Sequence, residues 1–250
     1  MFESLEGKAV LVTGGSRGIG KGIAARFARA GANVMITSRR EEDLAATAAE
    51  LGDGVAWCAA NVGRPEEAER AVDAVLEQFG RIDVLVNNAA TNPYAGPTID
   101  IDLPRWEKTW QVNLTGPLVL SQHAWNKWMK EGPGDCSIIN ISSVGALHTN
   151  PIIGAYDITK SALVHLTKQL AAELGPKVRV NAICPGLVRT DFARTLWEGD
   201  GEAHVARRNP LARIGEPDDI SGTALYLASS LAAWVTGEAI LVDGGQNVGF

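Results

Sequence analysis

Cysteine is scarce in this sequence of 250 residues. The 3 cysteines, Cys58, Cys136 and Cys184, are widely spaced, and none belongs to a Cys-x-x-Cys pair. An odd, scattered set of cysteines argues against a disulfide framework and suits the reducing cytoplasm, where buried thiols behave as small hydrophobic side chains. We therefore expect a cytoplasmic protein, and we expect no metal site.

Positive charge and long apolar runs are also lacking. The chain has 23 Lys and Arg against 29 Asp and Glu, which gives a net charge of −6, and it has no basic run. Nucleic acid is therefore not an expected partner. No apolar stretch approaches the ~20 residues of a transmembrane helix, and the acidic residues 1–6 lack the apolar region of a secretion signal. The sequence thus predicts neither a membrane protein nor a secreted one.

Short apolar runs alternate with amphipathic helical patterns, and no linker or low-complexity segment divides the chain. We therefore expect residues 1–250 to form a single domain. The alternation predicts an α/β fold of the Rossmann type, a doubly wound parallel sheet of seven strands with helices on both faces. In such sheets, ligands bind beyond the carboxyl ends of the strands. The expected strands are residues 8–12, 33–37, 55–58, 82–86, 137–141, 178–183 and 239–242.

The first expected strand leads into a glycine-rich turn, residues 13–20, which reads Thr-Gly-Gly-Ser-Arg-Gly-Ile-Gly. A helical pattern follows and stops at Gly31. Glycines let the backbone turn tightly and approach a pyrophosphate, whose charge then faces the amino end of the helix. The spacing differs from the common Gly-x-Gly-x-x-Gly fingerprint, but a strand, a glycine turn and a helix in this order predict a dinucleotide site.

The end of the second expected strand indicates which dinucleotide is bound. An NAD site places an acidic residue about 20 residues after the glycine turn, where it holds the ribose hydroxyls. Here that position is Ser38, followed by Arg39 and Arg40. Arg39 can grip the 2′-phosphate of NADP(H) with a charge-assisted fork, and Arg17 can add a second positive charge. The alternative is that the two arginines merely precede an acidic helix start; we favour NADP(H) over NAD.

A third candidate site follows the expected strand 137–141. Ser142 and Ser143 stand at its end, and Tyr156 and Lys160 are four residues apart on the next helical pattern. Side chains with this spacing leave one face of a helix, and a lysine ammonium beside a phenol lowers the pKa of the phenol. Such a tyrosine can work as a general acid or base, with a serine hydroxyl on the same substrate oxygen. Tyr-x-x-x-Lys is a common pattern, so the alternative is an amphipathic helix with an exposed tyrosine and lysine.

Two further segments stand out by a proline and by lost periodicity. Pro117 lies inside the helical pattern that begins near Asp102, and it has no N–H to offer the carbonyl of Asn113. Either the helix kinks and leaves this carbonyl free to hold a water or a side chain, or Pro117 breaks one helix into two. Residues 187–213 have no clear periodicity, and an irregular insertion of this length predicts a functional lid.

Together these motifs resemble the short-chain dehydrogenase/reductase family over nearly the whole chain. The resemblance implies that Tyr156 delivers a proton to the substrate carbonyl and that Lys160 lowers the Tyr156 pKa and holds the nicotinamide ribose. It also implies that Ser143 binds the reacting oxygen and that Asn113 holds the water of a proton relay to Lys160. The matching segments are residues 13–20, 61–62, 87–90, 113, 143, 156–160, 185–190 and 243–245.

A set of cofactor-binding residues is implied by the same resemblance. Two positions depart from the family pattern, because Asn61 replaces the usual aspartate and Ala90 replaces the usual glycine. Residues 61–62 and 88–90 would border the adenine and its ribose, and Val188 and Thr190 would contact the carboxamide. Besides Tyr156 and Lys160, the set comprises Gly14, Ser16, Arg17, Gly18, Ile19, Gly20, Ser38, Arg39, Asn61, Val62, Asn88, Ala89, Ala90, Ile141, Pro185, Gly186, Val188 and Thr190.

Within the family, the Ser16-Arg17 turn is similar to that of 3-oxoacyl-acyl-carrier-protein reductases. The leading expectation is therefore NADPH-dependent reduction of a 3-oxoacyl thioester in fatty acid biosynthesis, with an acyl carrier protein as a candidate partner. Residues 168–174 and 213–217 also resemble NADP-dependent carbonyl reductases of small ketones and retinal. Alternatives are a general carbonyl reductase, a dehydrogenase of a secondary alcohol, sugar or sterol, and a catalytically silent NADP-binding regulator. Family members are commonly tetramers, so a homotetramer is expected.

Overall fold

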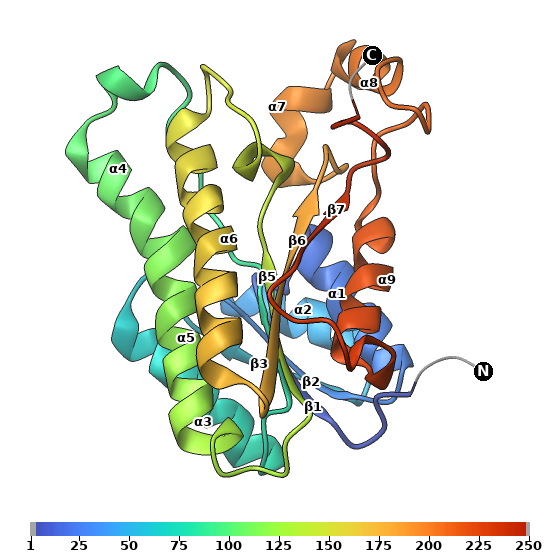
Figure 1. Ribbon diagram of the computed structural model, residues 1–250. Helices are drawn as coiled ribbons and strands as arrows, with labels where there is room; N and C mark the ends of the chain where they lie inside the picture. The colour runs from blue at the N-terminus through green and yellow to red at the C-terminus, as the bar shows by residue number, and fades with distance from the viewer. Residues whose placement is uncertain (1–3, 249–250) are drawn as a thin grey trace.

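Seven parallel strands form the centre of the molecule (Figure 1), as the sequence predicts. The computed structural model describes residues 4–248, so the expectation drawn from residues 1–6 falls partly outside the described residues. β1 lies between β2 and β4, which places the switch point of the sheet, where ligands bind in such folds, at the carboxyl ends of β1 and β4. In the order β3-β2-β1-β4-β5-β6-β7, the strands are Val55–Ala59, Asn33–Ser38, Ala9–Thr13, Val84–Asn87, Cys136–Ile141, Val178–Pro185 and Ala239–Val242.

Helices cover both faces of the sheet, and each face has its own apolar core (Figure 1). Phe27, Leu44 and Leu227 are fully buried on one face, and Val75 and Leu120 are buried on the other. The inner strands are thus covered on both sides, which is why they read as unbroken apolar runs. The first face carries α1 (Gly18–Arg29), α2 (Glu41–Leu51) and α9 (Pro217–Ala228), and the second carries α3 (Pro65–Phe79), α4 (Leu103–Trp110), α5 (Gly116–Ala124) and α6 (Gly154–Leu174).

The helix around Pro117 continues without a break. α4 passes through a π-helical turn, Gln111–Thr115, directly into α5, and Pro117 occupies the first turn of α5. In the π turn the N–H of Gly116 donates to the carbonyl of Gln111, one residue further back than in an α-helix. The alternative in which Pro117 divides the helix is therefore wrong, because the wider turn accommodates the proline. The free carbonyl of Asn113 stays a prediction.

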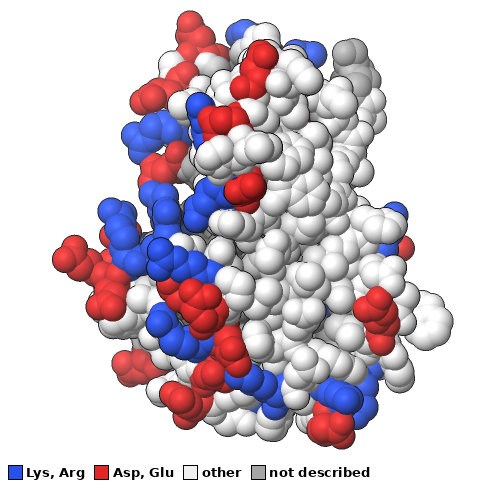
Figure 2. Space-filling model, turned by 90° about the vertical axis from the view of Figure 1, so that its left-hand side faces the viewer, with Lys and Arg blue, Asp and Glu red and all other residues white. Residues whose placement is uncertain are grey.

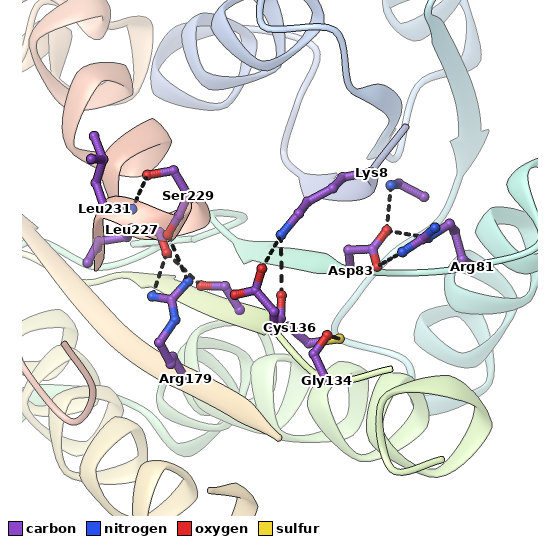
Figure 3. Close-up of polar contacts among 12 residues, drawn as sticks. Lys8, Arg81, Asp83, Gly134, Cys136, Arg179, Leu227, Ser229 and Leu231 are labelled. Atoms are coloured by element: carbon purple, nitrogen blue, oxygen red, sulfur yellow. Dashed lines mark hydrogen bonds and ion pairs between the residues drawn. The ribbon is translucent and has the colours of Figure 1, made fainter. Parts of the chain in front are cut away.

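Polar side chains fix the amino ends of the strands, at the edge opposite the switch point (Figure 3). Asp83, which is 2% exposed, accepts the backbone N–H of Ala9 at 2.8 Å and pairs with Arg81, so it joins β1 to β4. Arg179 of β6 donates to the carbonyl of Leu227 at 2.8 Å, and this bond satisfies a carbonyl in the last turn of α9. These bonds hold the sheet together at one end and leave the carboxyl ends free for a site.

The lid segment, residues 187–213, is more regular than its sequence predicts. Val188 pairs with Gly215 as an isolated bridge, so the two ends of the segment meet at its base. Helices this short, of less than about two turns, leave no periodicity for sequence analysis to detect. The lid segment contains a 3-10 turn and two short helices, Asp191–Ala193, Arg194–Trp197 (α7) and Gly201–Ala206 (α8).

Within residues 4–248, no helix combines the length and the apolar character that a membrane span requires.

Candidate active site

The glycine turn of residues 13–20 joins the end of β1 to the start of α1 at the switch point of the sheet. Gly14 and Gly18 have positive φ angles of 64° and 55°, which residues with a side chain rarely adopt. A Cβ atom on Gly20 would lie 2.8 Å from the carbonyl carbon of Gly14, so no side chain fits there. The turn therefore presents bare backbone at the amino end of α1, an arrangement that fits a pyrophosphate.

Thr13 and Asn88 connect this turn to the end of β4. Nδ2 of Asn88 donates to the carbonyl of Thr13 at 2.8 Å. The backbone N–H groups of Asn88 and Ala89 both donate to Oγ1 of Thr13, at 2.9 and 3.0 Å. Asn88 thus holds the glycine turn in place. Thr13 is missing from the predicted site residues, although a buried polar residue that closes an apolar strand is a signal that identifies it.

The other predicted residues of the turn and of the neighbouring strand ends lie close by. The carbonyl of Ser16 accepts the hydroxyl of Thr47 at 3.0 Å, which ties the turn to α2. Ile19 packs against the apolar core under α1. Oδ1 of Asn61 accepts the N–H of Gly63 at 3.2 Å, so the acceptor assigned to the adenine is shared with its own turn. The predicted residues Val62 and Ala90, at the ends of β3 and β4, are buried and half-buried.

The end of β2 carries the positive charge that was predicted to select the cofactor. The N–H of Gly15 donates to the carbonyl of Thr37 at 3.2 Å, so β2 ends against the glycine turn, with the half-buried Ser38 as its last residue. Arg39 and Arg17 are exposed, and within residues 4–248 neither forms an ion pair. Arg40, by contrast, pairs with Asp43 of α2. Two unpaired guanidinium groups beside the turn fit a phosphate better than a ribose hydroxyl.

The loop after β5 and the first turns of α6 bring Ser143 and Tyr156 together. Oγ of Ser143 accepts the N–H of Gly145 at 3.0 Å, within the short turn Val144–Ala146. The Ser143 hydroxyl also lies close enough to Tyr156 to lower the pKa of its phenol. Ser142 is 3% exposed and donates to the carbonyl of Lys160 at 2.9 Å. The geometry therefore favours Ser143 over Ser142 as the serine that faces a substrate.

The net shift of the Tyr156 pKa in the free protein is upward, whereas the sequence predicts a pKa lowered by Lys160. Burial raises the pKa of Tyr156, and the negative charge of Asp157 raises it further. The hydrogen bond from Ser143 lowers it, but by less than burial raises it. Spacing along the helix does predict that the two side chains are neighbours, because Nζ of Lys160 lies 5.5 Å from the centroid of the Tyr156 ring. It does not predict the desolvation of both groups, which disfavours their charged forms.

Lys160 is held at the end of β5. It is 2% exposed, and its Nζ donates to the carbonyl of Ile141 at 2.8 Å. Burial lowers the pKa of Lys160 from its ordinary value of 10.5 to about 8. A charged lysine has three N–H donors, and the carbonyl of Ile141 engages one of them. The position beside the Tyr156 ring fits the predicted role of holding ribose hydroxyls.

Asn113 uses its side chain inside the protein. The residue is 0% exposed, and its Oδ1 accepts the N–H of Thr91 at 2.8 Å. Its Nδ2 donates to the carbonyl of Thr91 at 3.0 Å and to Oγ1 of Thr159 at 3.1 Å. Asn113 thus ties the π turn to the loop after β4 and to α6, directly before Lys160. With the side chain engaged in this way, the predicted proton relay depends on the backbone carbonyl of Asn113.

The lid segment meets both parts of the site. A Cβ atom on Gly18 would lie 3.2 Å from Cγ2 of Thr190. The start of the lid therefore lies against the glycine turn. The Phe192 ring centroid is 6.0 Å from that of Tyr156, so the lid also covers the other end of the site. Phe192 is absent from the predicted residues because nothing in a segment without periodicity marks it.

The base of the lid is built from Pro185, Gly186 and Val188. Pro185 ends β6, and the N–H of Gly186 donates to the carbonyl of Val242 at 3.0 Å. A Cβ on Gly186 would lie 2.8 Å from Cα of Asp243, which explains the glycine. Val188 is 4% exposed. These residues lie along one side of the candidate site, and the glycine turn, Arg39 and Lys160 are the groups there that could donate hydrogen bonds to a cofactor.

Comparison with known proteins covers nearly the whole chain. Residues 14–247 match a family model described as enoyl-(acyl carrier protein) reductase. The chain is 39% identical over 246 residues to dehydrogenase/reductase SDR family member 4 of Sus scrofa, which covers 96% of this chain and 88% of the relative. It is 37% identical over 248 residues to the protein of the same name from Homo sapiens, with 97% and 88% covered.

Solved structures match the fold over the same extent. A short-chain type dehydrogenase/reductase from Mycobacterium ulcerans superposes with a TM-score of 0.93 at 38% identity, covering 98% of this chain and 92% of that chain. A blue fluorescent protein from a metagenomic library, in a crystal structure with NADPH, gives a TM-score of 0.89 at 33% identity and covers 98% of this chain and 100% of that chain. The similarity therefore includes the sheet, the glycine turn and the helix that carries Tyr156.

Proposed function

Because the chain belongs to the short-chain dehydrogenase/reductase family and is an oxidoreductase, we propose that it reduces a ketone to a secondary alcohol with NADPH. The observation that carries this proposal is the grouping of Ser143, Tyr156 and Lys160 at the ends of β5 and α6. When bound, the nicotinamide supplies the hydride, while the protein supplies position and the proton.

Each residue of this group has a defined task in the proposed reaction. Tyr156 gives its hydroxyl proton to the carbonyl oxygen of the substrate, and Ser143 donates a hydrogen bond to the same oxygen. The raised pKa of Tyr156 keeps the donating, neutral hydroxyl in place at pH 7. The ammonium of Lys160 stabilises the tyrosinate that proton transfer leaves, and Asn113 positions the relay that returns a proton.

The preference for NADPH is supported by Arg39 and Arg17, which are unpaired among the described residues beside the glycine turn. Ser38 stands where an acidic residue would repel a 2′-phosphate. A structural relative at 33% identity holds NADPH in its crystal structure, which supports the same choice.

A 3-oxoacyl thioester is the leading substrate in this proposal. The matching family model is described as enoyl-(acyl carrier protein) reductase, which names an acyl thioester of the carrier protein but a carbon–carbon double bond in place of the ketone. Arg207 and Arg208 are exposed at the end of α8, where they offer positive charge to an acidic carrier protein. A plain ketone is the second candidate. It is favoured by the Phe192 ring beside Tyr156 and by Leu147 and Leu196, which are 48% and 50% exposed on the adjoining loop and lid.

Initial rates of nicotinamide oxidation test the proposal. NADPH and NADH are compared against acetoacetyl thioesters and a panel of plain ketones and diketones. Fast turnover of NADPH with the thioester alone supports the leading substrate, and activity on plain ketones with a poor thioester supports the second. Tyr156→Phe is expected to lower turnover by about 100-fold or more, since general acid catalysis contributes about that factor. A Tyr156→Phe variant with near-normal turnover would contradict the mechanism.

We further propose a cytoplasmic homotetramer. Figure 2 shows the side of the molecule on which α4 and α5 lie: charged side chains crowd one half of this face, and the other half has few of them. The exposed residues in the amino-terminal half of α6, Ile158, Ser161 and His165, include no Lys, Arg, Asp or Glu. At the far edge of the sheet, β7 is followed by no further strand within residues 4–248, and Leu241 is 41% exposed. Both surfaces suit contact with further copies of the chain.

A further inference from the structure

A buried carboxyl group lies directly beside the proposed proton donor. Asp157 follows Tyr156 on α6 and is 4% exposed. Neither of its carboxyl oxygens has a hydrogen-bond partner of normal geometry in the part of the chain that the structure describes. An unpaired, buried carboxylate is unfavourable, so its presence beside an active site requires an explanation.

The Asp157 side chain lies against the turn that holds Ser143. A Cβ atom on Gly145 would lie 2.7 Å from Cγ of Asp157, and no other residue would come as close. Gly145 does not have a positive φ, so it is the Asp157 carboxyl, and not the backbone conformation, that excludes a side chain there. The N–H of Gly145 in turn donates to Oγ of Ser143. Asp157 therefore supports the position of Ser143 through Gly145.

The same carboxyl acts on Tyr156 through space. Burial raises the pKa of Asp157 to about 7, and the backbone N–H of Asn150 opposes this rise. The negative charge of Asp157 is second only to burial among the causes that raise the Tyr156 pKa. Within residues 4–248, the titratable groups on the same turns of α6 are Tyr156 and Lys160, and β6 carries Cys184, whose charge also raises the Tyr156 pKa.

We propose that Asp157 is a positioning residue for the Ser143–Tyr156 pair: it fixes the turn that holds Ser143, and its charge state sets the strength of Tyr156 as a proton donor. This inference rests on the proposed function. A protonated Asp157 leaves Tyr156 the stronger acid, which favours reduction of a ketone. An ionised Asp157 makes Tyr156 the weaker acid, and it also makes the tyrosinate needed for alcohol oxidation harder to form.

The pH dependence of Asp157→Asn tests the electrostatic part, because an amide keeps the shape and removes the titration. Wild type is expected to lose reduction rate as the pH rises through about 7, and Asp157→Asn is expected to keep its rate there. The rate of alcohol oxidation rises with pH as the tyrosinate forms, and this rise should occur about one pH unit lower in the variant. Glu173→Gln removes an exposed carboxyl from the last turn of the same helix, so it is the matched control and should follow wild type. Superimposable profiles of wild type and Asp157→Asn would overturn the proposal.

Stability of the free protein tests Asp157 independently of any substrate. The folded pKa is raised, so the stability of wild type should fall as the pH rises from about 4 through about 7, and Asp157→Asn should lack this fall. Gly145→Ala should lower the melting temperature in wild type and lower it less in an Asp157→Ala background. If no ketone is reduced but both stability results are obtained, the proposed reaction is wrong, whereas the buried carboxyl of Asp157 and its contact with Gly145 are supported. If neither result holds, Asp157 has no such role.

Discussion

Lys160 carries its charge in an almost fully buried position, and within residues 4–248 the carbonyl of Ile141 is the one acceptor of its Nζ. Its folded pKa of about 8 lies below the ordinary 10.5, so the unfolded chain binds more protons between these values and stability rises with pH across this window. Lys160 therefore destabilises the free protein at pH 7, by up to about 3 kcal/mol for a shift of this size. A residue proposed to act in binding and proton transfer is therefore kept at a cost in stability.

Lys160→Met is expected to lower turnover by about 100-fold or more, since it removes the charge beside Tyr156. At pH 7 the same change should raise the free energy of unfolding by about 2 kcal/mol, which is the desolvation cost less about 1 kcal/mol for the unpaired Ile141 carbonyl. Urea unfolding of the free protein at pH 7 and pH 9 measures both the gain and its decrease with pH. A Lys160→Met variant less stable than wild type at pH 7 would show that the buried charge of Lys160 does not destabilise the folded protein.

Arg39→Asp is expected to lower kcat/KM with NADPH by about 10- to 100-fold, because it removes charge-assisted hydrogen bonds of about 1.5–3 kcal/mol. The value with NADH should stay the same or rise, since an acidic residue at this point holds ribose hydroxyls. Arg40→Ala is the matched control, because Arg40 is the neighbouring arginine and pairs with Asp43. Equal effects of the two substitutions would refute the assignment of the 2′-phosphate to Arg39.

At the scale of elements, Arg189 joins the helices of the lid to the segment before α9. The guanidinium of Arg189 donates to both carboxyl oxygens of Glu202 on α8 and, at 2.9 Å, to Glu216 before α9. It also lies 5.3 Å from the Trp197 ring of α7. A planar, five-donor group is suited to joining three partners in this way. Arg189 stands between Val188 and Thr190, two of the predicted cofactor-binding residues, so these residues and the lid share one anchor.

Arg189→Ala is expected to loosen the lid and to raise KM for the carbonyl substrate by about tenfold, with a smaller change in kcat, since a tenfold change needs only about 1.4 kcal/mol. Arg194→Ala serves as the control, because Arg194 is on the same lid and pairs only locally with Asp191. Steady-state kinetics measure both variants. The lid would be shown to act without this anchor if KM were unchanged in Arg189→Ala.

At the scale of the whole molecule, apolar groups remain uncovered at one edge of the sheet. Trp234 is 100% exposed, and Leu231 and Leu241 are 65% and 41% exposed near β7. In the proposed tetramer these groups are buried between copies. Trp234→Arg is therefore expected to convert tetramers to dimers, as measured by light scattering. Trp57→Arg, at the opposite edge of the sheet on β3, is the control and should leave the assembly intact. A monomeric wild type would refute the assembly.

The sequence predicted all seven strands and their parallel arrangement, because strands buried on both faces read as short apolar runs between amphipathic helices. It also placed Tyr156, Lys160, Ser143 and the glycine turn at strand ends, since the carboxyl ends of parallel strands meet at one edge of the sheet. It offered the continuous helix around Pro117 as one of two alternatives, but it did not predict the π turn that decides between them, because a π turn leaves no mark in a pattern of 3.6 residues.

What the sequence by itself determined is therefore the order of elements and the chemistry available at their ends, because these depend on local periodicity and on residue type. The tertiary structure alone decided how strongly those groups act. Desolvation raises the pKa of Tyr156, whereas adjacency to Lys160 on a helix predicts a lower one, and it lowers the pKa of Lys160 as well. The role of Asp157 is likewise decided by packing, because a carboxyl becomes a titrating neighbour near pH 7 only when α6 presses it against Gly145 and away from water.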